Sequence, residues 1–159
     1  MNKKIVLAII VFWVILAAVF ALSGEFTMRT GKEVLLKTVP VDPRDLLRGD
    51  YVTLSYEISR LPKVHRFDIG QTVYVVLKTD DKNVATVDSY SYTIPKNKFF
   101  IKGKVHKFLW SGREIKYGIE SYFVKEGTGK ELENKLRTGT YAKVLIDKNG
   151  NAKVKELVY

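Results

Sequence analysis

Three aspartates lie within nine residues in the first third of the chain, at Asp42, Asp45 and Asp50. Carboxylates that converge in a folded protein provide the general acid and base of a hydrolase such as a glycosidase. Arg44 and Arg48 lie among them, close enough in sequence to form ion pairs with them. Two interpretations stay open, acid–base catalysis and structural pairing, and the sequence favours structural pairing.

The same stretch also has the features of a turn that leads into a β-strand. Asp42 before Pro43 is a typical start of a helical turn, and Gly49 can end that turn by adopting a positive φ. After Asp50 the apolar residues alternate, which is typical of a half-buried strand. We therefore expect a capped turn over residues 43–48, then a strand whose inward face carries Val52, Leu54, Tyr56 and Ile58.

The run from Gly49 to Tyr56 reads GDYVTLSY and fits G-D-Y-x-x-L-x-Y at every specified position, so the chain resembles the GDYXXLXY protein family. The segments Val41–Arg44 and Tyr117–Glu133 are also similar to that family, which extends the resemblance over roughly residues 34–158. The resemblance implies a membrane-anchored bacterial protein, often encoded beside multi-spanning membrane proteins. It supplies no catalytic residues to carry over.

The motif and the turn before it form the candidate functional surface. Its polar side chains could bind a partner, or Tyr51 could simply cover the turn while its hydroxyl bonds to a nearby group. The sequence favours the structural role over the binding role. The residues of this candidate motif surface are Asp42, Arg44, Asp45, Arg48, Gly49, Asp50, Tyr51, Leu54 and Tyr56.

The N-terminus carries 18 consecutive apolar residues, Ile5–Leu22, after Lys3 and Lys4. As a helix this run is about 27 Å long, close to the thickness of a bilayer core. We expect a signal anchor over residues 1–23, a linker over 24–33, and an extracytoplasmic β domain over 34–159, with the short basic N-terminus in the cytoplasm. Cleavage after Ala21-Leu22-Ser23 is the alternative.

The rest of the chain is dominated by strand patterns, so the expected fold class is mainly β. After the transmembrane helix we expect a small antiparallel β barrel or sandwich with one short helix, from the capping residue Thr128 to Gly139. Asn149-Gly150 predicts a hairpin turn. The expected strand regions are Val34–Val39, Thr72–Thr79, Val84–Ile94, Lys98–Trp110, Glu114–Val124 and the hairpin Thr140–Tyr159.

Several common chemistries lack their residues here, and we expect no cofactor and no metal. The chain has no cysteine, and its two histidines, His65 and His106, are far apart in sequence. Asp147–Asn151 only faintly resembles a calcium loop, because its glycine is fourth instead of sixth. Glu126–Lys130 lacks the glycine spacing of a phosphate-binding P-loop.

The formal net charge of +10 raises the question of an anionic partner. Nucleic acid is not expected, because the lysines are dispersed through the strands instead of being clustered in a stripe. The leading hypothesis is a non-enzymatic module at the outer face of the cell membrane, held by its N-terminal helix, that binds or supports a multi-spanning membrane protein. The alternatives are a hydrolase that uses Asp42, Asp45 and Asp50, and a protein that binds anionic lipid surfaces.

Overall fold

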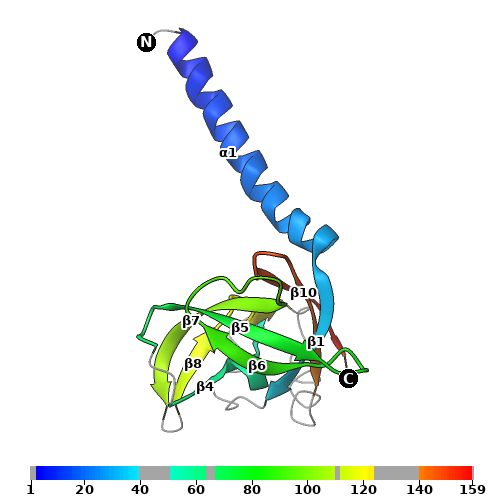
Figure 1. The fold of residues 1–159 in the computed structure, drawn as a ribbon. Coiled ribbons are helices and arrows are strands. Elements are labelled where there is room, and N and C mark those ends of the chain that lie inside the picture. The colour runs from blue at the N-terminus through cyan, green and yellow to red at the C-terminus, as the bar shows by residue number, and fades with distance from the viewer. Residues whose placement is uncertain (1–2, 40–50, 64–66, 110–111, 124–139, 159) are drawn as a thin grey trace.

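The computed structural model describes residues 3–39, 51–63, 67–109, 112–123 and 140–158. Within these residues the chain is mainly β, with one N-terminal helix (Figure 1). The elements are α1 (Lys3–Thr30), β1 (Lys32–Val39), β2 (Tyr51–Thr53), β3 (Ser55–Tyr56), the short 3₁₀ turn η2 (Glu57–Ser59), β4 (Arg60–Pro62), β5 (Thr72–Thr79), β6 (Ala85–Ser91), β7 (Phe100–Leu109), β8 (Gly112–Lys116), β9 (Ser121–Phe123), β10 (Tyr141–Ile146) and β11 (Ala152–Val158).

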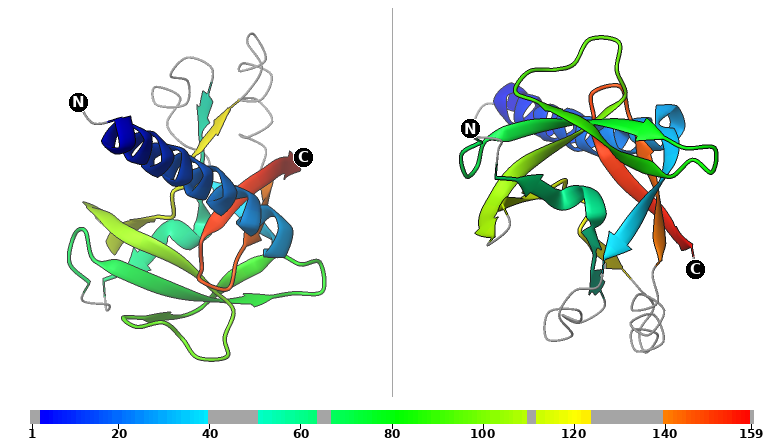
Figure 2. Two further views of the ribbon diagram at one scale, coloured as in Figure 1. Left: turned by 90° about the horizontal axis from the view of Figure 1, so that it is seen from above. Right: turned by 60° about the horizontal axis from the view of Figure 1, so that its bottom comes forward.

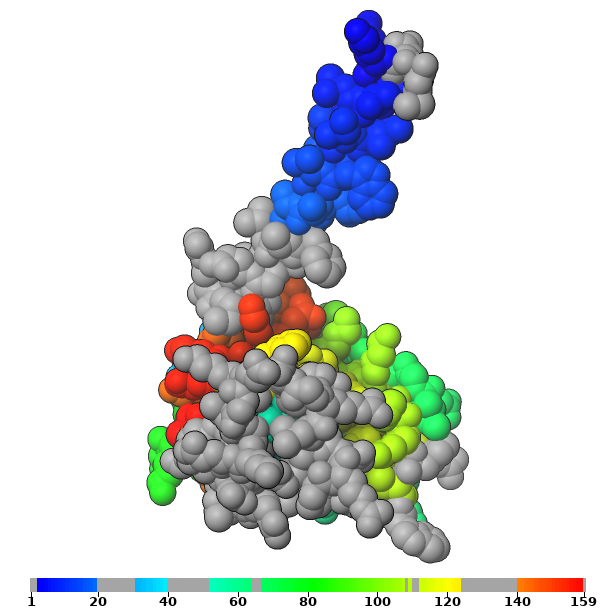
Figure 3. All heavy atoms as spheres, turned by 180° about the vertical axis from the view of Figure 1, so that it is seen from behind, coloured from blue at the N-terminus to red at the C-terminus, as the bar shows by residue number. Residues whose placement is uncertain are grey.

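Helix α1 projects away from the β domain as a single rod (Figures 1 and 3). The N-terminal helix is confirmed, whereas the predicted membrane span is not shown. The helix runs on to Thr30 through most of the expected linker. No proline interrupts that stretch, and a single glycine such as Gly24 costs a helix only about 1 kcal/mol. Among the described residues, no helix has both the length and the apolar character that crossing a bilayer requires.

The β domain consists of antiparallel sheets that include a half-barrel (Figure 2). One sheet has the order β11-β10-β1-β3, a second has the order β4-β8-β7-β5-β6, and β2 pairs with β9. The first two sheets meet where the amide of Leu35 in β1 donates to the carbonyl of Asn83, at 2.9 Å, beside an isolated bridge to Val84. The domain core therefore lies between β1–β10 and the five-stranded sheet.

The inward face predicted after Gly49 is confirmed, since each of its side chains is at most 3% exposed: Val52, Leu54, Tyr56 and Ile58. The prediction of one continuous strand is wrong. The backbone pairs with β9 through β2 and then with β1 through β3, before it turns in η2. Side-chain alternation continues across this change of partner, because each pairing keeps the chain extended.

Other predicted elements differ mainly at their ends. The expected strand Glu114–Val124 is divided into β8 and β9 at Gly118, which has φ +81°. The strand β6 stops at Ser91, whose hydroxyl accepts from the amide of Thr93 at 3.2 Å. The terminal hairpin, β10–β11, is confirmed. The capped turn over residues 43–48 and the short helix Thr128–Gly139 lie outside the described residues.

Candidate functional site

The described part of the sequence motif belongs to the core. The hydroxyl of Tyr56 is fully buried and donates to the carbonyl of Ile119 at 2.6 Å, and Leu54 is 2% exposed. The amide of Leu54 donates to the carbonyl of Glu120 at 2.7 Å. Burial raises the pKa of the Tyr56 hydroxyl far above its ordinary value, with the nearby Glu120 carboxylate as a second cause. These residues therefore hold two segments of the sheet together.

A second tyrosine makes the reciprocal bond between the same two segments. The hydroxyl of Tyr117 donates to the carbonyl of Ile58 at 2.6 Å. Burial also raises the pKa of Tyr117, and the neighbouring Tyr90 and Glu120 raise it further. Since Tyr56 and Tyr117 each reach across to the other segment, residues 56–58 and 117–119 are cross-linked twice by buried hydroxyls.

The rest of the candidate motif surface lies outside the residues that the structure describes, apart from Tyr51, which pairs in β2 with Phe123. The aspartate cluster, and with it the hydrolase hypothesis, therefore stays a prediction. His65 is also outside the described residues, whereas His106 lies in β7. The residues of the candidate motif surface that lie outside the described ranges are Asp42, Arg44, Asp45, Arg48, Gly49 and Asp50.

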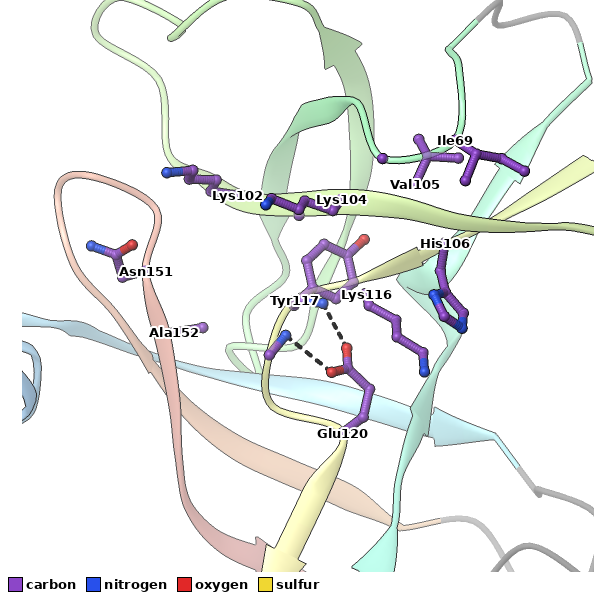
Figure 4. A pocket seen from close by; sticks show the side chains of 13 residues that line it. Ile69, Lys102, Lys104, Val105, His106, Lys116, Tyr117, Glu120, Asn151 and Ala152 are labelled. Carbon is purple, nitrogen blue, oxygen red and sulfur yellow. Dashed lines mark hydrogen bonds between the residues drawn. The ribbon is translucent and has the colours of Figure 1, made fainter.

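A surface hollow of about 670 Å³ lies between β7, the β8–β9 connection and the start of β11 (Figure 4). We call it the lysine hollow. Figure 4 shows the lysines of β7 on one side, Asn151 and Ala152 across the opening, and Tyr117 with Glu120 between them. Its volume falls within the range of small-molecule sites. The lining residues are Ile69, Gly70, Lys102, Gly103, Lys104, Val105, His106, Lys116, Tyr117, Gly118, Glu120, Asn151 and Ala152.

The lysine hollow carries a net positive charge, because Lys102, Lys104 and Lys116 face one carboxylate among the described lining residues, that of Glu120. Lys104 lies directly opposite Lys116 in the antiparallel pair β7–β8. None of the three lysines makes an ion pair with any residue in the described ranges. The lysine charges of the hollow are therefore not neutralised by described protein groups.

The one carboxylate of the lysine hollow is already engaged by the backbone. Glu120 accepts from the amide of Tyr117 at 2.6 Å and from the amide of Gly118 at 3.0 Å, and so closes the turn between β8 and β9 (Figure 4). Gly118 allows this turn because its φ of +81° lies in the left-handed region. Glu120 thus positions one wall of the hollow.

Two close backbone approaches fix the other walls. A Cβ on Gly103 would lie 2.4 Å from Cγ2 of Ile115 and 2.9 Å from Cδ1 of Tyr117, so these two side chains can pack against β7 in this way because residue 103 is glycine. The β10–β11 loop is joined to β7 by the amide of Lys102, which donates to the carbonyl of Gly150 at 2.8 Å. The hollow is therefore built on paired strands.

The lysines of the hollow suit an anionic group, and its one described carboxylate is not free for acid–base catalysis. Unpaired lysines attract phosphate or carboxylate, while general acid–base work needs titratable groups that are free to exchange protons. Glu120 is bonded to two amides. Within the described ranges, no group of three or more histidine, aspartate or glutamate side chains is placed to hold a metal ion.

Sequence reasoning missed the lysine hollow. The signal was present in "IKGKVH" (Ile101–His106), where lysines alternate along a predicted strand and so share one face. Lys116 comes from another predicted strand. Only the register of β7 against β8 places it opposite Lys104.

Comparison with protein families finds one model that covers most of the chain. The model described as GDYXXLXY protein matches residues 13–157. The comparison with curated proteins finds no match, and the comparison with solved structures finds none either.

Proposed function

The chain belongs to the GDYXXLXY protein family, and from this premise we propose that it is a non-enzymatic module, tethered to a membrane by α1, whose β domain binds or supports a membrane-protein partner. The observation that carries the proposal is the exposure of α1. Large apolar side chains are exposed along residues 3–19 of α1, each between 46% and 63%. They are Ile5, Leu7, Ile9, Ile10, Val11, Phe12, Trp13, Val14, Ile15, Leu16 and Val19.

An apolar rod of this kind needs a cover other than its own domain. Contiguous exposed apolar surface marks a contact with membrane or protein, because water disfavours it. The uncharged run Ile5–Leu22 and the flanking Lys3 and Lys4 support lipid as the cover and a cytoplasmic N-terminus. The β domain would then lie at the outer face of the membrane.

The use of the motif supports a binding role over an enzymatic one. Leu54 packs in the core, and the hydroxyl of Tyr56 makes a buried hydrogen bond. The lysine hollow offers charge for binding, with its one described carboxylate bonded to backbone amides. A domain of paired strands held at a membrane surface is suited to presenting such a surface to a neighbouring membrane protein.

The tether is tested by alkaline carbonate extraction of membranes that contain the full chain. We expect the wild-type chain to stay in the membrane pellet, and the double variant Ile9→Lys/Phe12→Lys to move into the soluble fraction, because two charges within the apolar run oppose burial in lipid. Thr86→Lys, at an exposed position of β6, is the control and should stay in the pellet. Release of the wild-type chain by carbonate would overturn the tether.

The partner is tested by cross-linking in intact cells. The chain has no cysteine, so Lys78→Cys introduces a single exposed thiol whose reaction with a membrane-impermeant maleimide reports the side of the membrane. A photo-reactive residue at an exposed position such as Lys104 or Lys78 should then give one discrete adduct at the position nearer the partner. Labelling only after lysis contradicts the outer location, and a lack of adducts at all exposed positions contradicts the partner.

A further inference from the structure

We propose that the lysine hollow binds the phosphate group of an anionic lipid headgroup. The proposal rests on the proposed function for the source of the ligand, since α1 must bring the domain to a membrane. The site itself rests on independent observations: its charge, its position beside α1, its apolar rim, and an electrostatic conflict within the sheet that a bound anion would relieve.

The charge of the hollow matches a phosphate. Lys102, Lys104 and Lys116 line one opening and have no ion-pair partner in the described ranges. By contrast, two lysines on the β10–β11 hairpin are paired, Lys143 with Glu156 and Glu33, and Lys155 with Glu33 at 2.8 Å. A phosphate oxygen accepts hydrogen bonds from ammonium groups and remains ionised at neutral pH. The lysines of the hollow are therefore available to an external anion.

The position of the hollow favours a lipid source. Helix α1 contacts β10 and β11, and the start of β11 supplies Asn151 and Ala152 to the opening. Figures 1 and 2 show the β10–β11 hairpin beside the end of α1 from which β1 departs. If α1 lies in a membrane, this end of the domain is the end nearest the headgroups. A cation close to anionic headgroups then adds to the membrane affinity.

The rim adds an apolar contact to the basic one. Ile69 lines the opening and is 53% exposed, so it presents an aliphatic side chain at the rim. The loop that carries it is held in place, because the amide of Gly70 donates to the carbonyl of Val105 at 2.7 Å. An exposed aliphatic side chain beside lysines is the combination by which protein surfaces bind the boundary between headgroups and acyl chains.

The sheet carries an electrostatic conflict at this site. Lys104 and Lys116 are directly opposite on β7 and β8, and like charges in that position destabilise an antiparallel pair. A phosphate held between them would relieve this repulsion. Positions that lower stability and raise binding are typical of functional sites.

The ligand is tested with the full chain in micelles of an uncharged detergent. The probes are short-chain phosphatidylglycerol, short-chain phosphatidylcholine and glycerol 3-phosphate, and the readout is the rate at which each lysine is acetylated. We expect phosphatidylglycerol to slow the acetylation of Lys102, Lys104 and Lys116 severalfold. Lys78 and Lys82, which are exposed outside the hollow, should be unaffected.

Three results would overturn the assignment. Equal protection by glycerol 3-phosphate would show that a free phosphate suffices and would remove the lipid source. Protection by none of the three probes would remove the site. Protection by an acidic peptide alone, tested in the same way, would assign the lysines to a protein partner. Each result is separate from the carbonate extraction, because the micelle assay does not depend on membrane insertion.

A matched pair of variants measures the contribution of the lysines. We expect Lys102→Gln/Lys104→Gln/Lys116→Gln to weaken binding of phosphatidylglycerol by roughly fivefold per lysine, on the order of a hundredfold in total. The control Lys78→Gln/Lys82→Gln/Lys96→Gln removes the same charge outside the hollow and should change the affinity less than twofold. Equal losses in the two variants would show a general charge effect and overturn the site.

The sign of the stability change gives a second, independent readout. Without lipid, Lys104→Gln should raise the thermal midpoint, because it removes the repulsion with Lys116. With saturating phosphatidylglycerol, its midpoint should rise less than that of the wild-type chain. The control is Lys78→Gln, because Lys78 lies opposite the uncharged Thr86 in the β5–β6 pair, and it should show neither change. If the thermal midpoint of Lys104→Gln without lipid is unchanged or lower, the proposed repulsion between Lys104 and Lys116 is contradicted.

Discussion

Two tyrosine hydroxyls join the motif segment to the β8–β9 connection. Tyr56 and Tyr117 donate to carbonyls in each other's segment, both at 2.6 Å, and both side chains are buried. Removing a hydroxyl leaves a buried carbonyl without its partner, which costs more than an average hydrogen bond contributes. At the scale of single residues, the hydroxyl groups of Tyr56 and Tyr117 therefore contribute to stability in addition to the packing of their rings.

Tyr56→Phe and Tyr117→Phe should each lower the free energy of unfolding by about 1–3 kcal/mol. Urea unfolding followed by circular dichroism measures this change. Tyr74→Phe is the control, because Tyr74 packs edge-on against Phe100 and its hydroxyl makes no hydrogen bond within the described ranges. It should change stability by less than about 0.5 kcal/mol. Equal effects of all three variants would deny the hydroxyls this role.

The same tyrosines predict a loss of stability in alkaline solution. Burial raises the pKa of Tyr56 and Tyr117 in the folded state, while an unfolded tyrosine ionises near about pH 10. Their contribution is complete below about pH 10. Above it, the unfolded state releases protons that the folded state retains, so the free energy of unfolding falls by up to about 1.4 kcal/mol per pH unit for each tyrosine.

Comparison of variants isolates this effect from the titration of lysines. The stability difference between the wild-type chain and Tyr56→Phe should be constant below about pH 9.5 and should shrink as the pH rises further. Urea unfolding at a series of pH values measures it. A difference that grows or stays constant up to about pH 11 would contradict a raised pKa at Tyr56.

At the scale of elements, two hairpin loops have the same pattern of hydrogen bonds. In the β5–β6 loop, Asp80 accepts at its Oδ1 from the amides of Lys82 and Val84. In the β10–β11 loop, Asp147 accepts at its Oδ1 from the amides two and four residues later. The fourth residue of each loop, Asn83 or Gly150, has positive φ. The loops differ in burial, since Asp147 is 5% exposed and Asp80 is exposed, and in one further bond, from Nδ2 of Asn151 to Asp147.

The two aspartates therefore form a pair for measuring what burial and the additional Asn151 bond contribute together. Asp147→Ala should lower the free energy of unfolding by about 2–3 kcal/mol, because it also loses the bond from Nδ2 of Asn151 and leaves amides unpaired. Asp80→Ala should cost about 1 kcal/mol, since water can replace its carboxylate. Thermal unfolding of the two variants, in parallel, checks the order. A larger loss for Asp80→Ala would show that burial does not decide the cost.

The sequence predicts an element well when the interactions that form it lie between residues close together along the chain. The strand Thr72–Thr79 and the hairpin around Asn149-Gly150 were predicted from local pattern, and the structure confirms both. Local pattern also predicted the buried face of residues 52–58. It could not predict that β2 and β3 pair with different strands, because β9 lies far along the chain from its partner β2.

The candidate site shows the same limit more strongly. The alternation of Lys102 and Lys104 is visible in the sequence, but their meeting with Lys116 depends on a register that contains a bulge between Val105 and Lys107. The opposite wall comes from Asn151, nearly fifty residues later. A site assembled from four segments needs the tertiary fold, whereas the motif was visible because it is contiguous.

At the scale of the whole molecule, α1 is nearly independent of the domain that follows it. Its contacts with the strands are concentrated at β10 and β11. The strand β1, by contrast, pairs with β10 over six residue pairs from Lys32 to Lys37 and continues onto β3. The helix therefore ends at Thr30 and the β domain begins at Lys32, with Gly31 between them.

Truncation should confirm this boundary. A chain of residues 32–159 should unfold cooperatively, with a free energy of unfolding within about 1 kcal/mol of the full chain in detergent. A chain of residues 40–159 also loses β1, which pairs on both sides, and should not fold. Circular dichroism during urea unfolding distinguishes the two. Failure of the longer fragment to fold would show that α1 is an integral part of the domain.

The single residue between α1 and β1 also limits how far the domain can reach. An extended residue spans at most about 3.6 Å, so the start of β1 stays within a few ångströms of the end of α1. If α1 is embedded in a membrane as proposed, a domain so closely attached sweeps only a thin layer above that surface. Any molecule confined to that layer meets it at a high effective concentration, on the order of millimolar for short connections. Individually weak contacts are then sufficient for lasting occupancy, and targets that project well above the layer are out of range.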